Sequence, residues 1–529
     1  MAKKIVDRSN FILQIGSMIW SVALAFLLMY SNRHFYHDDS YITLRYVNNY
    51  LAGLGIVWNP GEYVQGYTNF LHLMLISLLG SIGIDLVWAS RIIGLAALIA
   101  LAFVVFQFKK IFNFSDIMPF LPLILVITSS PMLIWSIAGL EGTVFSFLVA
   151  TGHLLFLLAM DTPRNAHRFF TTSGIVFGLG YLTRPDGALF IAVSFSLLIW
   201  MQITDDKKKL SNLILFAAGV FVIVAPYSIW QFFYYGDIVP NTFYAKTGVP
   251  LKVCIKSGFR YFLKYAMHPP FLPFITLFSI IRALLKRHWN CKLTYLSLSV
   301  SSYIMFLVLA GGDHMPSFRL VLPIIPLMSI ILAAGLFQTR NTRFTASVFM
   351  VSIILTTGLQ ILDSESNPRK LDPAAIVGAI VGKYIETAWP SGSLVALNTA
   401  GSTPYFAEKH LFIDMLGLND RIIAQRKIDI LELEWQLIPG HLKGDGNYVL
   451  SRKPDYVILG PADGREVFVP IGMKTPMPWF LSDLELSRNP DFAEHYTLER
   501  VFLEGDGHAI VEGGFHFTYY KRLQDNGSR

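Results

Sequence analysis

Apolar and polar stretches divide the chain into two unequal parts. From Phe11 to about Leu362 the sequence is a series of apolar runs separated by short polar segments, whereas residues 363–529 have the mixed composition of a soluble domain. An apolar run of about 20 residues is long enough for a helix to cross a bilayer. The pattern therefore predicts a polytopic α-helical membrane domain at 1–362, followed by a soluble domain at 363–529.

The positions of Lys and Arg predict the topology, because positively charged loops tend to stay in the cytoplasm. Clusters of cations separate the apolar runs at 3–8, 109–110, 164–168, 207–209, 286–287 and 340–343. Neighbouring clusters must enclose an even number of crossings, and a last crossing puts the soluble domain outside. The expected spans, about 11 transmembrane helices, are 11–31, 86–108, 119–138, 141–160, 171–183, 187–203, 211–235, 270–285, 292–310, 319–337 and 344–362.

Two apolar segments near the N-terminus differ from the other predicted spans. The run from Phe11 to Ser31 follows three cations, as in a signal peptide, but no clear small-residue cleavage site ends it, so we expect an uncleaved first helix. The segment 70–79 is about half the length of a span. We expect it to lie along the outer face or to dip into it.

Composition agrees with this picture and excludes some classes of protein. Hydrophobic residues make up 53% of the chain and charged residues only 15%, compared with about 25% charged residues in soluble domains. The net charge of +7 comes from the clusters between apolar runs, not from one basic face, so topology explains it better than nucleic-acid binding does. Two cysteines, Cys254 and Cys291, are too few for a disulfide framework or a four-cysteine zinc site.

Five polar segments fall on the outer side in the predicted topology, at 37–69, 139–141, 184–187, 235–246 and 311–319. They could be ordinary loops. Their residue types, and their convergence on one membrane face, instead indicate a site for a lipid-borne substrate.

An acid pair, Asp38 and Asp39, directly follows the first predicted span. A carboxylate close to the hydrocarbon region is costly, so such acids are usually partnered or functional. The alternative is that one of them caps a helix or pairs with Arg45. The residues after the pair form an amphipathic segment with Ile42, Val47 and Leu51 along one side.

The soluble part predicts a small mixed α/β domain, because short strand-like runs alternate with helical or turn segments. The expected strands are 393–397, 411–416, 456–459, 508–511 and 515–520. Polar residues between them could bind a ligand, or they could fix loops and dock the domain on the membrane part: Asp414, Asn419, Asp420, His441, Lys443 and Arg452. No nucleophile elbow or P-loop occurs in this part, which argues against a second catalytic activity.

Seven segments occur in a recognisable order along the chain. They are HDDSYITLRYVNNYLAGLGIVWNPGEYVQGYTNF, SIAGLEGTVF, GLGYLTRPDGALF, YYGDIVPNTFYAK, GGDHMPSFRLVLPIIPL, DMLGLND and GHLKGDGNYVLSRKPDYVILG. As an ordered set they resemble the GT-C fold glycosyltransferases, and most of all the family of mycobacterial terminal β-(1→2)-arabinofuranosyltransferases and its Gram-negative relatives. Gln65 departs from the pattern, since an acid is expected before Gly66–Asn69.

The resemblance implies an inverting glycosyltransferase. It would move arabinofuranose or a similar sugar from a polyprenyl-phosphate donor to a cell-envelope glycan or glycolipid acceptor. It would lie among the lipids of the bacterial inner membrane, with its site and soluble domain on the periplasmic side. The family's base maps onto Asp38 or Asp39, and the order of the family's acid pair favours Asp38.

The remaining site residues follow from the same chemistry. The outer cations Arg184, Lys246 and Arg319 could hold the donor phosphate, or could reach toward headgroups. The expected sugar- or acceptor-binding residues are Glu141, Asp186, Asp313, His314, Tyr67, Asn69 and Asn241. The charged members of this set could instead form ion pairs with the three cations. Asp and His side chains could hold a divalent metal, but their spacing matches no dedicated metal motif.

Two other classes of function stay open from the sequence. A transporter or flippase for a lipid-linked sugar would place polar groups near the membrane midplane and often has inverted repeats, whereas these polar groups lie at one face. A scaffold or sensor is compatible with an outer domain, but it does not account for five converging polar segments.

Overall fold

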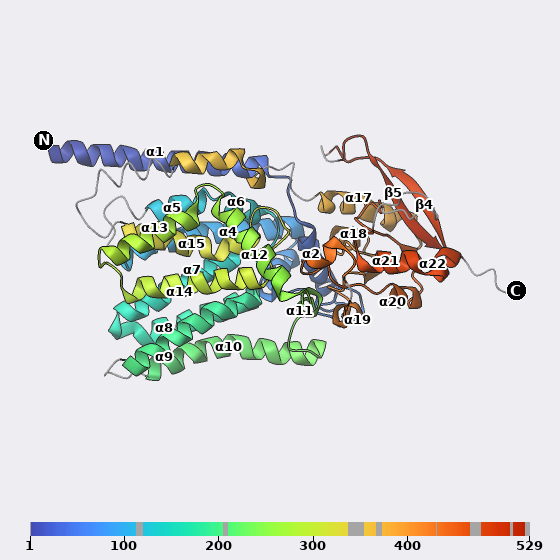
Figure 1. Ribbon diagram of the computed structural model, residues 1–529, viewed down its shortest axis with the longest axis horizontal. Coiled ribbons are helices and arrows are strands. Elements are labelled where there is room, and N and C mark those ends of the chain that lie inside the picture. Colours follow the sequence, from blue (N-terminus) through green and yellow to red (C-terminus); the bar gives the residue numbers. More distant parts are fainter. Residues whose placement is uncertain are drawn as a thin grey trace.

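The computed structural model describes residues 2–112, 120–204, 210–336, 354–366, 373–429, 431–465, 478–507 and 511–523, with side chains from Gly16 onward. Long helices run side by side and form a bundle, and the C-terminal domain sits at one end of it (Figure 1). The two ends of the chain lie at opposite ends of the molecule (Figure 1). The predicted helical membrane part and C-terminal sheet are both present.

The bundle contains most of the predicted spans as helices. They are α1 (Ala2–Ser31), α4 (Leu86–Gln107), α5 (Phe120–Ile127), α6 (Ser130–Ile137), α7 (Gly142–Asp161), α8 (Ala166–Thr183), α9 (Ala188–Thr204), α10 (Leu210–Tyr235), α13 (Leu272–Leu285), α14 (Cys291–Leu309) and α15 (Ile325–Leu336). Among the described residues, six helices are long and apolar enough to cross a membrane, or seven if the bent pair α5 and α6 is one span. The total of eleven stays a prediction. Part of the last expected span, and the clusters at 207–209 and 340–343, lie outside the described residues.

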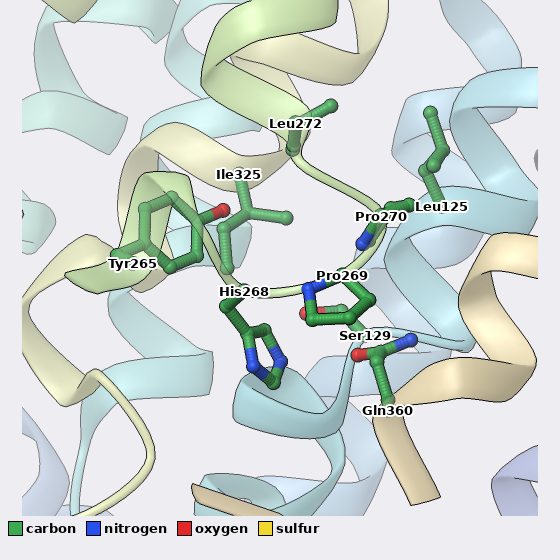
Figure 2. Close-up of a pocket in the computed structure, with 9 residues that line it drawn as sticks. All are labelled: Leu125, Ser129, Tyr265, His268, Pro269, Pro270, Leu272, Ile325 and Gln360. Atoms are coloured by element: carbon green, nitrogen blue, oxygen red, sulfur yellow. The ribbon is translucent and has the colours of Figure 1, made fainter. Parts of the chain in front are cut away.

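The predicted span at 119–138 is broken in the structure. Helices α5 and α6 meet at an angle of 53°. A break inside a membrane helix leaves backbone groups that need partners, because no water is available there. Gln360 supplies them: its Oε1 accepts from the backbone N of Ser130 at 2.8 Å, and its Nε2 donates to the carbonyl of Thr128 at 3.0 Å. Figure 2 shows Gln360 beside this break, in a small pocket with Ser129, His268 and Pro269.

One end of the bundle gathers the described cation clusters. Lys292, at the start of α14, lies 2.6 Å from a carboxylate oxygen of Asp161 at the end of α7 and 3.4 Å from the carbonyl of Ile111. These contacts bring the clusters at 109–110, 164–168 and 286–287 to the same end. Which side of the membrane this end faces stays a prediction.

Shorter elements cover the opposite end. They are α2 (Asp38–Leu51), α3 (Phe70–Ser81), η3 (Pro185–Gly187), α11 (Asn241–Lys246), α12 (Leu251–Ala266) and η4 (Arg319–Ile324). At 12 residues α3 is too short to span a bilayer, in line with the expectation for 70–79. Helix α12 was not expected from the sequence. Four further 3₁₀ turns are η1 (Phe108–Lys110), η2 (Pro163–Asn165), η5 (Leu359–Leu362) and η6 (Ser364–Ser366).

The C-terminal domain is built on a five-stranded mixed sheet with the strand order β2-β1-β3-β5-β4. The strands are β1 (Leu394–Leu397), β2 (Leu411–Asp414), β3 (Tyr456–Val457), β4 (Tyr496–Leu503) and β5 (Phe515–Arg522). Strands β1, β2 and β3 are parallel, whereas β5 is antiparallel to both β3 and β4. Strand β4 was missed, and the strand expected at 508–511 falls mostly on residues outside the described ones.

Helices connect and flank these strands. They are α17 (Ala374–Ala388), α18 (Ser402–Phe406), α19 (Arg421–Gln425), η8 (Glu434–Leu437), α20 (Gly446–Ser451), α21 (Leu481–Arg488) and α22 (Pro490–His495). One hydrophobic core joins this domain to the first outer loop, since Tyr41, Tyr46 and Trp58 pack in the same cluster as residues of α17 and the sheet. The predicted domain boundary near residue 362 stays a prediction, but the two parts share a core.

Candidate active site

The acid pair begins helix α2. His37 is the N-cap, and its Nδ1 accepts from the backbone N of Asp39 at 3.2 Å. Acids in the first turn of a helix are favoured by the positive end of the helix dipole. Consecutive residues on a helix point in different directions, so Asp38 and Asp39 have different surroundings.

Asp38 is bound to the outer domain. Its Oδ1 accepts from the backbone N of Ser402 at 2.8 Å and from the Ser402 hydroxyl at 2.7 Å, and its Oδ2 accepts from the backbone N of Gly401 at 3.2 Å. Gly401 has no side chain for a clear reason: a Cβ there would lie 2.1 Å from the Asp38 carbonyl oxygen. These contacts make Asp38 the cap of α18 and a link between the two parts of the molecule.

Asp39 is half-buried, and its carboxylate makes no hydrogen bond or ion pair with any other described residue. Burial alone would raise its pKa, but the charges of His37, Arg319 and Lys246 together outweigh burial and lower it. The carboxylate is therefore ionised at neutral pH and available to a ligand.

Lys246 ends helix α11, and its side chain is exposed. No acid among the described residues lies within ion-pair distance of its ammonium. Crowding by surrounding protein lowers its pKa, as does the charge of Arg319, while Asp39 and Asp313 act in the opposite direction. The loop at Gly440 of the outer domain packs on its aliphatic stem, since a Cβ at Gly440 would lie 3.6 Å from Lys246 Cγ.

Arg184 is held between two acids. Its Nη1 donates to Glu141 Oε1 at 2.9 Å, and its Nε donates to Asp186 Oδ1 at 3.0 Å. The acids are themselves positioned: Asn69 Nδ2 donates to Glu141 Oε2 at 3.0 Å, and the Tyr303 hydroxyl donates to Asp186 Oδ2 at 2.6 Å. Arg184 is therefore fixed in place with most of its charge compensated.

Arg319 is paired with Asp313: its Nε donates to Asp313 Oδ2 at 3.0 Å, and its Nη2 lies 3.0 Å from the same oxygen. Burial would raise the pKa of Asp313, but Arg319 and His314 lower it to about 2. The His314 ring packs edge-on against His441 of the outer domain, with centroids 4.8 Å apart. Burial and the neighbouring His314 lower the pKa of His441 to about 4, so His441 is neutral at pH 7.

The structure thus brings nine of the expected site residues into one connected group, which we call the charge cluster. Its members are linked by hydrogen bonds, ion pairs or mutual effects on pKa, and they are Asp39, Asn69, Glu141, Arg184, Asp186, Lys246, Asp313, His314 and Arg319. They come from all five polar segments that the sequence places on one face.

The two remaining sugar- or acceptor-binding candidates contact helix α10 and the outer domain, respectively. The Tyr67 hydroxyl is 3.1 Å from that of Tyr235, and Asn241 Nδ2 donates to the carbonyls of Gly417 and Leu418 at 2.8 and 3.0 Å. In the outer domain, Arg452 pairs with Glu62 at 3.1 Å, and Lys443 donates to the carbonyl of Arg426 at 2.7 Å.

Sequence reasoning missed several residues that support the cluster. Trp135 Nε1 donates to the carbonyls of Pro316 and Ser317, which holds the segment before Arg319. His72 lies near Glu141, and its Nε2 contacts the carbonyl of Gly139 at 3.1 Å. These side chains, like Tyr303, stand within apolar runs, where no local signal distinguishes them from core residues.

The described residues contain no group of three His, Cys, Asp or Glu side chains arranged to hold a metal ion. In the charge cluster each acid except Asp39 is already paired with a cation. The arrangement instead offers an ionised carboxylate, Asp39, and an exposed ammonium, Lys246, close enough for each charge to shift the pKa of the other.

Comparison with known proteins gives one family match and one curated relative. Residues 371–520 match a family described only as a domain of unknown function, DUF8728. A stretch of 228 residues is 29% identical to the terminal β-(1→2)-arabinofuranosyltransferase of Mycobacterium tuberculosis. That stretch is 40% of this chain and 35% of the mycobacterial protein, so the chain matches about a third of that relative's length.

Solved structures show the fold. The apo structure of ArnT from Cupriavidus metallidurans superposes with a TM-score of 0.52 at 13% identity, over 78% of this chain and 89% of ArnT. Mycobacterial arabinofuranosyltransferase AftD gives 0.50 at 13% identity, over 97% of this chain and 40% of AftD. The archaeal oligosaccharyltransferase AglB from Archaeoglobus fulgidus gives 0.50 at 13% identity, over 85% of this chain and 69% of AglB. At this identity the likeness concerns the fold alone, and it confirms the resemblance to the GT-C fold glycosyltransferases.

Proposed function

We propose that this chain is an inverting glycosyltransferase that moves a sugar from a polyprenyl-phosphate donor to a hydroxyl group of a cell-envelope glycan or glycolipid. The observation that carries the proposal is the presence of Asp39 and Lys246, two unpaired groups of opposite charge, in the same cluster. Both lie in the charge cluster, both are at least partly exposed, and neither is paired with another described residue. A base and a phosphate-binding cation are the two groups that this reaction requires.

Each residue has a defined task in the proposed reaction. Asp39 takes the proton of the acceptor hydroxyl as its oxygen forms a bond to the anomeric carbon of the sugar. The bond from that carbon to the donor phosphate breaks, and the phosphate leaves with the bonding electrons. Lys246 stabilises the negative charge on the leaving phosphate. Attack opposite to the leaving group inverts the anomeric configuration.

Asp39 is favoured over Asp38 as the base, although the family pattern pointed to Asp38. The Asp38 carboxylate accepts three hydrogen bonds from Gly401 and Ser402. Three hydrogen-bond donors stabilise the ionised form of the Asp38 carboxylate and occupy its oxygens. Asp38 is therefore poorly placed to take a proton from a substrate. Asp38 would instead hold the outer domain over the site.

The paired cations and acids have a positioning role in this proposal. Arg184 and Arg319 are each held by acids at about 3 Å, so their guanidinium groups keep a fixed geometry at low net charge. Fixed dipoles and charges of this kind lower the reorganisation needed in the transition state. Their remaining N–H groups could bind phosphate oxygens beside Lys246.

The names of two similar proteins support the donor class in this proposal. The relative in M. tuberculosis is named as an arabinofuranosyltransferase, and AglB was solved in complex with a dolichol-phosphate, a polyprenyl phosphate. We therefore assign an arabinofuranose or similar sugar on a polyprenyl phosphate, used by a bacterial inner-membrane protein with its site facing the periplasm.

The test is a release assay with the purified full-length protein in detergent. Incubation with a polyprenyl-phospho-arabinofuranose and a glycan acceptor should release polyprenyl phosphate and extend the acceptor, both measured by mass spectrometry. Transfer of intact donor across proteoliposomes without release of polyprenyl phosphate would instead identify a flippase.

Lys246→Gln should lower the turnover about 100-fold, as loss of one stabilising group for a developing negative charge does. Lys383→Gln removes an exposed cation of the outer domain and serves as the matched control, with turnover unchanged. Equal turnover of the two variants would remove Lys246 from the reaction.

A further inference from the structure

Helix α12 carries two parallel rows of exposed side chains. Every fourth residue is a large apolar one that is 41–61% exposed, and these are Leu251, Ile255, Phe259, Leu263 and Met267, the last directly following the helix. The residue after each of the first four is an exposed cation, and these are Lys252, Lys256, Arg260 and Lys264. Residues four apart lie one above the other on a helix, so the rows run side by side along its length.

The opposite side of α12 is buried against the active-site segment. Cys254, Gly258 and Tyr261 face the end of α14 and the turn that follows it. A Cβ at Gly258 would lie 2.5 Å from the carbonyl oxygen of Val308, and one at Gly312 would lie 2.6 Å from Tyr261 Cβ. The two rows therefore face away from the protein, and the orientation of the helix is fixed by close packing.

The cations of this helix are largely uncompensated. Lys264 binds Glu365. Lys252, Lys256 and Arg260 have no acid within ion-pair distance among the described residues, and all three are exposed. A negatively charged partner is the complement of such a surface.

The position of α12 makes these cations unusual. The helix follows Lys246 and precedes α13, so it lies at the end of the bundle that carries the charge cluster, close to α11 (Figure 1). The topology drawn from the sequence places this end outside the cytoplasm, where Lys and Arg are less frequent. Four cations here need a reason other than topology.

We propose that α12 is an interfacial helix that binds the headgroups of anionic phospholipids. Its apolar row would lie among the upper parts of the acyl chains, and its cations would contact lipid phosphates. A helix with an apolar side and adjacent Lys and Arg side chains is suited to the boundary between headgroups and hydrocarbon. A cation at every fourth position makes it too costly to bury the exposed side of α12 in the hydrocarbon core of the membrane.

An open pocket at the end of the helix offers one headgroup a defined place. It is lined by Arg260, Lys264, Leu263 and Met267 of the α12 region, together with Phe318, Ser364 and the acids Asp363 and Glu365. Glu365 binds Lys264, so Arg260 is the cation of this lining without an ion pair to a described residue. Cations and apolar side chains thus lie on the same wall, as a lipid with a charged head and apolar chains requires.

Lipid binding here would stabilise the site from the outside. The Tyr261 hydroxyl accepts a hydrogen bond from the backbone N of Leu320 at 3.1 Å, directly after Arg319. Holding α12 at the interface therefore also holds the segment that carries Asp313 and Arg319. This inference does not depend on the proposed reaction.

The test uses thermal stability of the purified full-length protein in a nonionic detergent. A short-chain phosphatidylglycerol, a short-chain phosphatidylcholine and inorganic phosphate are titrated separately, and the rise in Tm gives an apparent affinity for each. We expect phosphatidylglycerol to raise the Tm and the other two to have little effect. In the combined variant Lys252→Gln, Lys256→Gln and Arg260→Gln, the apparent affinity for phosphatidylglycerol should fall about 10- to 100-fold.

A matched control removes three exposed cations of the outer domain through Lys383→Gln, Lys427→Gln and Arg500→Gln. It should keep the response of the unmodified protein, and both variants should have a similar Tm without lipid. An equal response of the two variants to phosphatidylglycerol would overturn the proposal. A phosphatidylcholine response as large as that to phosphatidylglycerol would do the same, and so would an equal effect of inorganic phosphate, which would indicate a simple anion site.

Discussion

Two regions meet at the first outer loop, and their polar groups are arranged in opposite ways. In the docking region, where α2 and the following turn touch the outer domain, the polar groups of Asp38, Arg45 and Asn59 are bound to partners in that domain. In the charge cluster, on the other side of the same loop, Asp39 and Lys246 have no paired partner among the described residues.

This difference in pairing distinguishes polar residues that hold the structure together from polar residues that are available for a reaction. Buried polar groups that are fully hydrogen-bonded fix a geometry, whereas an unpaired charge in a crowded site is stable only if a ligand or solvent compensates it. Asp38 and Asp39 are neighbours in the sequence, yet they belong to different regions. The identity of a residue in a motif does not by itself reveal which role it has.

The largest expected effect on the docking region comes from Arg45. Its guanidinium donates to the carbonyls of Trp58, Pro404 and His410, and so ties α2 to α18 and β2. Arg45→Met keeps the length of the side chain but removes the donor to the buried carbonyls of Pro404 and His410, while the carbonyl of Trp58 keeps only the bond from Asn49 Nδ2. This loss should cost about 3 kcal/mol. For a domain of this size we expect the Tm to fall by roughly 6–12 °C.

Arg500→Met, at an exposed position of β4, is the matched control and should leave the Tm within about 1–2 °C. A normal Tm for Arg45→Met would mean that the docking region does not hold the two parts together.

Asp414, at the end of β2 in the outer domain, should contribute a distinct part of the pH dependence of stability. Burial raises the pKa of Asp414 to about 6, although hydrogen bonds from Asn419 and Leu416 act against it. The folded protein therefore keeps a proton that the unfolded chain, with a pKa of about 3.9, has lost. This stabilisation is complete below pH 4 and is lost as the pH rises through about 6, by up to about 2–3 kcal/mol.

His441, whose pKa is lowered to about 4, contributes in the opposite direction over this range, so the loss is measured as the difference in thermal unfolding between the unmodified protein and Asp414→Asn from pH 4 to 7. Asp414→Asn cannot ionise and should remove this part of the pH dependence. If Asp414→Asn showed the same fall in stability with rising pH as the unmodified protein, another group would be responsible for that fall.

The activity that we assign to the charge cluster should, in contrast, depend little on pH in this range. Surrounding charges lower the pKa of Asp39, and His441, with a pKa of about 4, is already neutral. Because Asp39 must be ionised to act as a base, kcat/KM should change little between pH 5 and 7. A profile with an acid limb centred near pH 6 would show that another group acts as the base.

Charge spacing in the sequence was enough to predict that five polar segments meet at one face, and nine of the expected residues do form one cluster. Strands β1, β2, β3 and β5 also followed from short apolar runs between turns. These features depend on local patterns and on the number of crossings, which a sequence carries directly.

What the sequence could not provide depends on contacts between distant residues. Asp38 is assigned to docking by Ser402, which is 364 positions away. The break between α5 and α6 is compensated by Gln360, 230 positions from Ser130. Helix α12 was overlooked because its cations interrupt the apolar residues too often for a membrane span. Its apolar residues and its cations each recur at every fourth position, and this spacing is the signal that could have predicted the helix.

The two acids, compared in one assay, test the central claim most directly. Turnover and Tm should be measured for Asp39→Asn and Asp38→Asn in the same detergent, with release of polyprenyl phosphate as the readout. We expect Asp39→Asn to lose about 10²- to 10⁴-fold in turnover with an unchanged Tm, and Asp38→Asn to lower the Tm while keeping most of the turnover per folded molecule. The reverse pattern, with chemistry lost in Asp38→Asn and stability lost in Asp39→Asn, would contradict the account.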